Sequence, residues 1–192
     1  MLRPSARLPH FAILLGLAWA VAAAQLLLVH WAQTGATLLD TDDAMRLVQL
    51  RAFLAGRGWC DLHEPRLQPP HGYDSHWSRL VDAGLAGLLL LLRQVTEPAA
   101  AERLMRALWP LLWLLPTVAG MAAVAWRLAG REAATVALIL AVLAVPGYQQ
   151  FTPGRVDHHN VQIALAVLTV AATVWADRRL WCGWAAGALT GL

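Results

Sequence analysis

The sequence predicts an all-α membrane protein, a polytopic bundle of helices with one large outer loop after the first span. Composition is the first reason, because 58% of the 192 residues are hydrophobic and only 14% are charged. The second is that apolar stretches long enough to cross a hydrocarbon core of about 30 Å recur along the chain. The formal net charge is only +3 and the sequence has no basic tract, so we expect no nucleic-acid partner.

The first predicted span covers residues 11–30. No charged residue interrupts the run from Phe11 to Val29, and Trp31 follows where an interfacial aromatic residue belongs. A cleaved signal peptide is the alternative, because the alanines at 22–24 resemble a small-residue cleavage site. The apolar run continues past these alanines, so we favour an uncleaved signal-anchor.

Residues 31–106 form the predicted outer loop. After a group of acids it carries a helical stripe of Leu47, Leu50 and Leu54, which ends at two glycines. Residues 83–93 are strongly apolar, but only about ten apolar residues stand in a row there, against the roughly 20 that a spanning helix needs. We therefore expect an interfacial or re-entrant helix at 83–93.

Four further spans are predicted, at residues 107–127, 133–149, 161–177 and 180–192, of which the last is truncated. Pro110 and Pro116 predict kinks in the first of these. Since the chain ends within an apolar run, we expect it to be the front portion of a longer protein.

The arginines decide the predicted topology. If residues 83–93 do not cross, three basic clusters lie on one side of the membrane: Arg3 and Arg7, Arg127 and Arg131, Arg178 and Arg179. The positive-inside rule makes that side cytoplasmic, which predicts a multi-pass protein of the cell inner membrane with a cytoplasmic N-terminus. If the segment did cross, the middle cluster would lie outside, against the rule. The non-crossing topology also places both polar motifs described below on the outer face.

The first motif consists of Asp40, Asp42 and Asp43. Aspartates at a helix start cap free N–H groups for about 1 kcal/mol each, so capping is one interpretation. Three carboxylates within four positions exceed what capping needs, and they raise one another's pKa unless a cation is near. A bound divalent cation is therefore the alternative interpretation.

The second motif is Arg155-Val156-Asp157-His158-His159. A polar helix start, capped by Asp157 or Asn160, is one interpretation. The i, i+2 spacing of Asp157 and His159 in an extended or turning segment places both side chains on one side, which suits two ligands of one metal, with His158 pointing elsewhere. Such ligands favour Mn²⁺ or Mg²⁺, with Zn²⁺ as a further option. Arg155 is either a phosphate partner or an ordinary interfacial arginine.

The order of these features resembles the catalytic subunit of oligosaccharyltransferases and the wider GT-C superfamily of membrane glycosyltransferases. In that family an Asp after the first span begins a helix that ends in a Gly about four turns later, and Asp43 to Gly58 fits best, with Asp40 and Asp42 as fallback. The family's second outer loop carries Asp-x-Asp, Asp-x-Glu or, in some archaeal members, Asp-x-His, which Asp157 and His159 resemble. The family's third acidic site and its Trp-Trp-Asp motif have no counterpart before Leu192.

The resemblance implies a metal-dependent membrane glycosyltransferase. The donor would be a sugar or oligosaccharide on a polyprenyl phosphate or pyrophosphate, and the acceptor a protein or glycan at the outer face, with membrane lipid as the remaining partner. It implies that Asp43 and Asp157 are catalytic and bind a divalent cation, Mn²⁺ or Mg²⁺, together with His159. Additional candidate ligands are Asp40, Asp42 and His158, and Arg46 or Arg155 would hold the donor phosphate.

Two other classes of function remain open. A polytopic transporter or permease with an outer-face metal or substrate site would share the proline-containing spans and the ionisable groups, but transporters place such groups near the bilayer midplane. A membrane scaffold without catalysis would leave the clustered acids unexplained.

Overall fold

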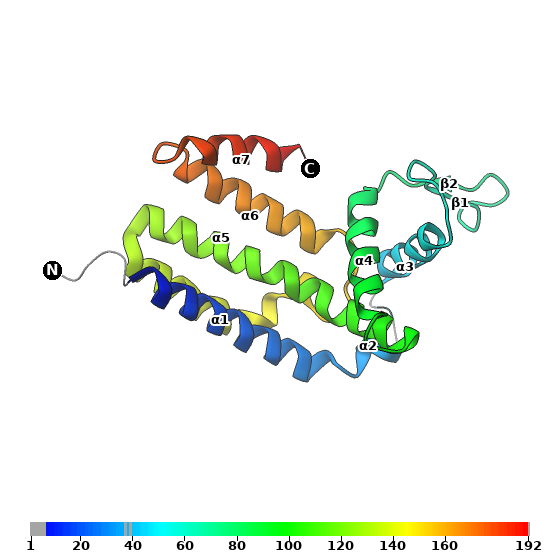
Figure 1. Ribbon diagram of the computed structural model, residues 1–192, viewed down its shortest axis with the longest axis horizontal. Helices are drawn as coiled ribbons and strands as arrows, with labels where there is room; N and C mark the ends of the chain where they lie inside the picture. Colours follow the sequence, from blue (N-terminus) through cyan, green and yellow to red (C-terminus); the bar gives the residue numbers. More distant parts are fainter. Residues whose placement is uncertain (1–6, 37, 39, 192) are drawn as a thin grey trace.

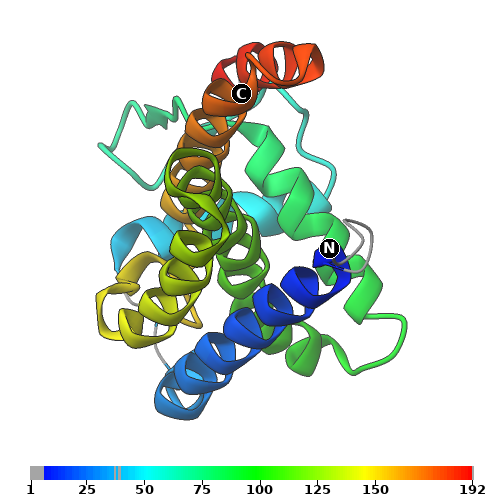
Figure 2. The ribbon, with the colours of Figure 1, turned by 90° about the vertical axis from the view of Figure 1, so that its left-hand side faces the viewer.

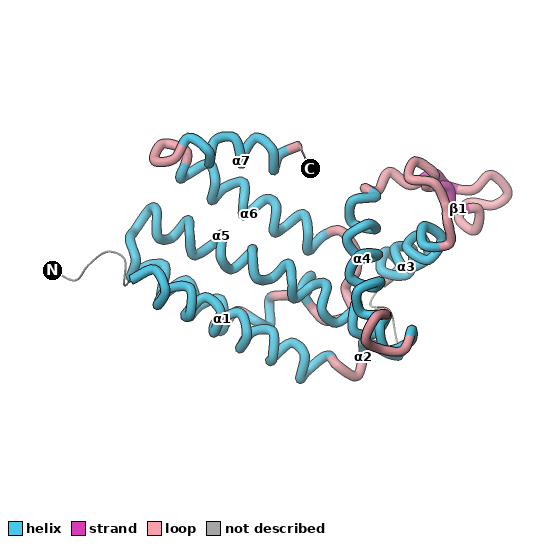
Figure 3. Tube along the Cα trace, viewed as in Figure 1, coloured by secondary structure: helices cyan, strands magenta, loops and turns pink. Residues whose placement is uncertain are grey.

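Helices make up almost all of the regular structure in residues 7–36, 38 and 40–191, the part of the chain that the computed structural model describes. Arg3 of the first basic cluster and Leu192 lie outside these residues. The α-helices are α1 (Arg7–His30), α2 (Gln33–Ala36), α3 (Thr41–Leu54), α4 (Arg79–Leu92), α5 (Pro98–Leu143), α6 (His159–Trp175) and α7 (Leu180–Thr190). Two short strands, β1 (His63–Glu64) and β2 (Tyr73–Asp74), pair antiparallel in the long loop between α3 and α4 (Figure 3). The all-α prediction is confirmed.

The long helices lie side by side in an antiparallel bundle (Figures 1 and 2). The helix α5 is broken at Gly130, where φ is 87° and ψ is −177°, a conformation that glycine adopts at little cost. The chain reverses there, so α5 consists of two arms. The first contains residues 107–127, and the second ends at Leu143, six residues before the end of the predicted span at 133–149. The backbone stays helical through Pro110 and Pro116. After the second arm, the 3₁₀ turns η2 (Val145–Gly147) and η3 (Gln149–Phe151) lead toward α6.

Two helices are long and apolar enough to cross a membrane, His10–His30 within α1 and Pro98–Leu143 in α5, which suggests association with a membrane. The apolar helix His159–Trp175 is shorter, and at 17 residues it is about 25 Å long. The number of crossings and the orientation of the N-terminus stay predictions.

The helix α4 lies across the end of the bundle instead of along it (Figure 1). Ser78 caps it by accepting a hydrogen bond from the N–H of Leu80, so it starts four residues before the expected segment. Its 14 residues span about 21 Å, too short for a hydrocarbon core. That α4 lies at a membrane interface stays a prediction.

A hydrophobic core holds α3 and α4 against the start of α5. The predicted stripe is confirmed, because Leu47 and Leu50 are almost completely buried against Leu85 and Leu89 of α4 and Met105 of α5. Full burial of such a side chain contributes about 1.5–3 kcal/mol. The helix α3 ends at Leu54, followed by Gly56 at a φ of 99°. These contacts place the start of α3, and with it the acids, over the end of the bundle.

The two ends of the bundle differ in their charged groups. The Gly130 turn and the connection between α6 and α7 lie at one end, where Arg127 pairs with Asp177 at 2.5 Å (Figure 1). Arg178 and Arg179 belong to the same connection. The elements α2, α3 and α4 and the start of α6 lie at the other end. The structure therefore separates these basic clusters from the two acidic motifs, as the topology argument requires.

Candidate functional site

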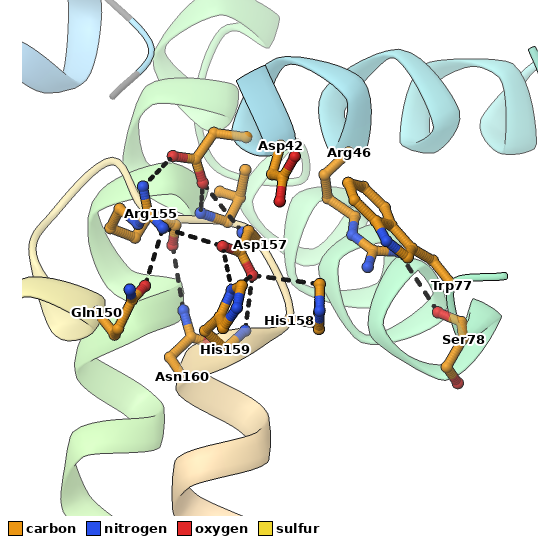
Figure 4. A network of polar contacts seen from close by, with 12 residues as sticks. Asp42, Arg46, Trp77, Ser78, Gln150, Arg155, Asp157, His158, His159 and Asn160 are labelled. Atoms are coloured by element: carbon orange, nitrogen blue, oxygen red, sulfur yellow. Dashed lines mark hydrogen bonds and ion pairs between the residues drawn. The ribbon is translucent and has the colours of Figure 1, made fainter. Parts of the chain in front are cut away.

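Asp40 is the N-cap of α3. Its Oδ1 accepts hydrogen bonds from the N–H groups of Asp42 and Asp43, each at 3.0 Å. The capping interpretation is therefore correct for Asp40, and it does not apply to the other two acids. The side chain of Asp42 extends from α3 toward Asp157 and His158 (Figure 4).

Asp43 joins the two motifs. Its side chain is fully buried, and its Oδ1 accepts hydrogen bonds from the backbone N–H groups of Val156, at 2.8 Å, and Asp157, at 3.1 Å. Satisfying two buried N–H groups with one carboxylate oxygen holds the segment before α6 against the start of α3. The two motifs, more than a hundred residues apart in sequence, thus form one site.

The guanidinium of Arg155 lies among the carboxylates (Figure 4). Its Nη1 pairs with Asp40 and lies 3.1 Å from Oδ2 of Asp43, while its Nη2 donates to Oδ2 of Asp157 and Oε1 of Gln150, both at 2.9 Å. In this conformation the guanidinium of Arg155 is engaged by carboxylates, and its role as a phosphate partner stays a prediction. It provides the positive charge that we had expected a metal ion to provide.

The charges and the burial of this cluster shift its pKa values in different directions. Burial raises the pKa of Asp43, although the N–H of Val156 and the charge of Arg155 oppose this effect. Burial also acts to raise the pKa of Asp40, but hydrogen bonds from the N–H of Asp43 and from Arg155 outweigh it, so the pKa of Asp40 lies below its usual value. The cluster thus holds one carboxylate that is easier to protonate and one that is harder.

Both imidazoles of the second motif lie at Asp157. Its Oδ1 accepts the N–H of His159 at 2.6 Å, and Nδ1 of His159 lies 2.6 Å from Oδ2. Nδ1 of His158 lies 3.3 Å from Oδ1, and the two rings stack with centroids 4.5 Å apart. The expectation that His158 points elsewhere is wrong, because its φ of −82° and ψ of −12° are helical and side-chain alternation requires an extended segment. Burial lowers the pKa of His158, against the charge of Asp157.

Two groups of side chains in the described part of the chain have the spacing of metal ligands. Asp40, Asp43 and Asp157 form one, and Asp157, His158 and His159 form the other, with ligand atoms within 4.8 Å of one another in each. All-carboxylate ligands suit Mg²⁺ or Mn²⁺, and a carboxylate with imidazoles suits Mn²⁺ or Zn²⁺. The predicted trio of Asp43, Asp157 and His159 is divided between these groups, which share Asp157. The residue types and spacing fit a divalent cation, but Arg155 already bridges the first group.

Arg46, the other candidate for the donor phosphate, belongs to the contact between α3 and α4. Its side chain is fully buried, its Nη1 donates to Oδ1 of Asp82 at 2.9 Å, and its guanidinium lies 4.4 Å from the ring of Trp77. Asp82 also accepts from Nη1 of Arg79 at 2.9 Å. The charge of Arg46 is thus paired with Asp82 of α4 in this structure, and its contact with a donor phosphate stays a prediction. The sequence did not predict this network. The one sign of it in the sequence was the pair of charged residues, Arg79 and Asp82, at the start of a strongly apolar helix.

A cavity of about 370 Å³ lies beside His158, between α4, α5 and α6. Trp77 and His158 line one part of it, and apolar side chains such as Trp109, Trp113 and Leu165 line the rest. Gly84 is required here, because a Cβ atom at this position would lie 2.7 Å from the ring of Trp109. The cavity was not predictable from spacing, since its residues come from three separate helices.

Comparison with protein-family models, with curated proteins and with solved structures found no match for this chain. What the chain does must therefore be argued from the site itself: three carboxylates, two imidazoles and a central guanidinium at one end of an apolar bundle, beside an apolar cavity.

Proposed function

We propose that the chain forms part of a membrane glycosyltransferase that transfers a sugar or oligosaccharide from a polyprenyl phosphate or pyrophosphate to a protein or glycan acceptor at the outer membrane face. One observation carries the proposal: the hydrogen bonds from Val156 and Asp157 to Asp43 bring the acids of two separate loops together at one end of an apolar bundle. The resemblance to GT-C enzymes in these same motifs supports it.

The chain's own residues would bind and orient the reacting groups. The acceptor attacks the anomeric carbon, the bond from that carbon to the phosphate oxygen breaks, and the phosphate leaves with the bonding electrons. The proton of the acceptor would pass to the carboxylate of Asp43. One oxygen of Asp43 is occupied by backbone N–H groups, and its Oδ2, which faces Arg155 in this structure, would become available to the acceptor or a cation once Arg155 turned away. If Arg155 turned away from Asp43 and Asp157, its planar guanidinium would suit the departing phosphate.

We propose that Asp43, Asp157 and His159 hold a divalent cation, Mn²⁺ or Mg²⁺, once Arg155 has moved. The cation would act as a Lewis acid on the departing phosphate oxygen. Asp157 and His159 are already in contact, at 2.6 Å, and Asp157 belongs to both ligand groups. Asp157 is therefore the residue on which cation binding should depend most.

The cavity beside His158 supports a donor that carries a lipid. Its walls are mainly apolar, and its polar lining includes His158, which contacts Asp157, so a lipid phosphate would lie near the charged residues while its chain stays among Trp109, Trp113 and Leu165. The helix α4, lying across the end of the bundle, provides one wall.

A transporter is the less favoured alternative. Transporters place ionisable groups near the bilayer midplane at broken helices. Residues 107–126 and 161–176 contain no Asp, Glu, Lys, Arg or His, whereas the acids lie at the end of the bundle. This position at the end of the bundle supports chemistry at a membrane surface over transport through the bundle.

The proposal is tested with the complete protein in membranes, a polyprenyl-pyrophosphate-linked sugar and Mn²⁺. Asp157→Asn should lower transfer by orders of magnitude and abolish the dependence on Mn²⁺. Asp177→Asn is the matched control, because Asp177 pairs with Arg127 at the opposite end of the bundle. An Asp157→Asn variant that is folded by thermal unfolding and transfers at the unmodified rate would end the proposal.

A further inference from the structure

A second polar pocket lies at the same end of the molecule, between α2, α3, the end of α4 and the start of α5. It measures about 680 Å³. Arg51, Arg93, Arg103 and Arg106 line it, together with a single carboxylate, Glu102. Neither acidic motif of the candidate site contributes to its lining. A pocket lined by four guanidinium groups and one carboxylate carries a marked excess of positive charge.

The one carboxylate is already paired. Nη2 of Arg51 lies 2.6 Å from Oε1 of Glu102, and Nε lies 3.2 Å from Oε2, a bidentate arrangement. Glu102 therefore neutralises Arg51. Among the described residues that line the pocket, no further carboxylate is present to pair with Arg93 and Arg103. The charges of Glu102 and Asp43 act on Arg106.

Arg103 is held in position by neutral groups. Its Nε donates to Oγ1 of Thr34 at 3.0 Å, its Nη2 donates to the carbonyl oxygen of Trp31 at 3.1 Å, and its guanidinium lies 4.4 Å from the Trp31 ring. These contacts orient the side chain without cancelling its charge. Orientation before binding lowers the entropy cost of capturing an anion.

The backbone adds to this positive potential. The pocket wall includes Ala99 and Ala100 in the first turn of α5, whose N–H groups are among those a helix leaves without an intrahelical partner. Glu97, the N-cap residue, makes no side-chain capping hydrogen bond. The positive, N-terminal end of the first arm of α5 thus joins the arginines.

The surroundings of the pocket have the composition of a membrane interface. Trp31 lies against Arg103 of the pocket wall, and Leu28, Val29 and Val95 nearby in the chain are large apolar side chains exposed on the surface. Tryptophan and arginine beside exposed apolar residues are typical of the membrane interface.

We propose that this pocket is a phosphate-binding site, which takes a phosphate group either as the headgroup of a membrane lipid or as free phosphate. Arg93 and Arg103 contact the anion, and Arg106, more than nine-tenths buried, lies at the inner side. The site is separate from glycosyl transfer and requires only that the chain is folded.

Two short-chain lipids test the proposal by calorimetry on the complete protein in detergent: dihexanoyl phosphatidic acid and dihexanoylglycerol, which lacks the phosphate. Inorganic phosphate is titrated separately. The phosphatidic acid should bind saturably and the glyceride should not. Stronger binding of phosphatidic acid than of inorganic phosphate identifies a lipid headgroup site, and equal binding identifies a site for free phosphate.

Three variants decide whether this pocket is responsible. Arg103→Gln and Arg93→Gln should each weaken binding about tenfold, because each removes a charged hydrogen-bond donor. Arg93 is exposed, so its variant still tests the site if Arg103→Gln fails to fold. Arg178→Gln, an exposed arginine at the opposite end, is the control and should bind normally. If neither ligand binds, or if Arg93→Gln binds as tightly as Arg178→Gln, the proposal is overturned.

Discussion

Replacing Arg155 by glutamine should destabilise the protein strongly. The change removes the group that faces Asp40, Asp43 and Asp157, and it leaves two carboxylates, those of Asp43 and Asp157, almost completely buried without their partner. Breaking a buried ion pair from one side costs about 3–5 kcal/mol. Asp40 is 42% exposed, so its share is only about 0–1 kcal/mol.

We therefore expect a loss of about 3 kcal/mol in the free energy of unfolding, the lower end of that range, since the carboxylates can take up protons or water. For a chain of 192 residues this corresponds to a fall in Tm of roughly 6–12 °C. Thermal unfolding in detergent at pH 7, followed by circular dichroism, measures it. Arg178→Gln is the control and should change Tm by about 1–2 °C at most, because this exposed pair contributes about 0.5 kcal/mol or less.

The same variant tests whether a cation and the guanidinium compete for one place. Millimolar Mn²⁺ should raise the Tm of Arg155→Gln by several degrees and the Tm of the unmodified protein by less, because removing the guanidinium exposes repelling carboxylates to the ion. If Arg155→Gln melts within 2 °C of the unmodified protein, the central ion-pair network contributes little and our reasoning is refuted. If Mn²⁺ affects both proteins equally, competition between ion and guanidinium is refuted.

Three further predictions concern Asp43, Asp40 and topology. Asp43→Ala leaves two buried N–H groups without an acceptor and should lower the free energy of unfolding by about 2–4 kcal/mol. Asp43→Asn keeps an acceptor oxygen and should lower it by less. Equal unfolding temperatures for the two variants would show that these hydrogen bonds do not contribute to stability. The folded-state pKa of Asp40 is depressed, so Asp40 stabilises the protein above the unfolded-state pKa of about 3.8, and this contribution is lost as pH falls below that value. The difference in Tm between the unmodified protein and Asp40→Asn should therefore vanish near pH 2. A difference that persists at pH 2 contradicts the pairing. The exposed Cys60 should react with an impermeant maleimide from outside the cell, and the Glu132→Cys variant should react at position 132 only after permeabilisation. Labelling at position 132 in intact cells would contradict the predicted topology.

The sequence by itself determined those features that depend on near neighbours. Charge-free runs and their interruptions marked the long helices, and the break in α5 falls at Gly130, within the predicted connector. The stripe of Leu47 and Leu50 predicted a buried helix face, and Asp40 could be read as a helix cap, because periodicity and capping involve residues within a few positions of one another.

Only the tertiary structure decided which charged groups are partners. Nothing in the spacing shows that Asp43 accepts hydrogen bonds from Val156 and Asp157, or that Arg155 lies among the carboxylates where a cation was expected. Burial determines these pairings, because a charge removed from water is stable only next to a partner, and packing can supply that partner from a residue distant in sequence. The arginine pocket was missed for the same reason: α2, α3, α4 and α5 each supply part of its wall, and only their packing brings these parts together.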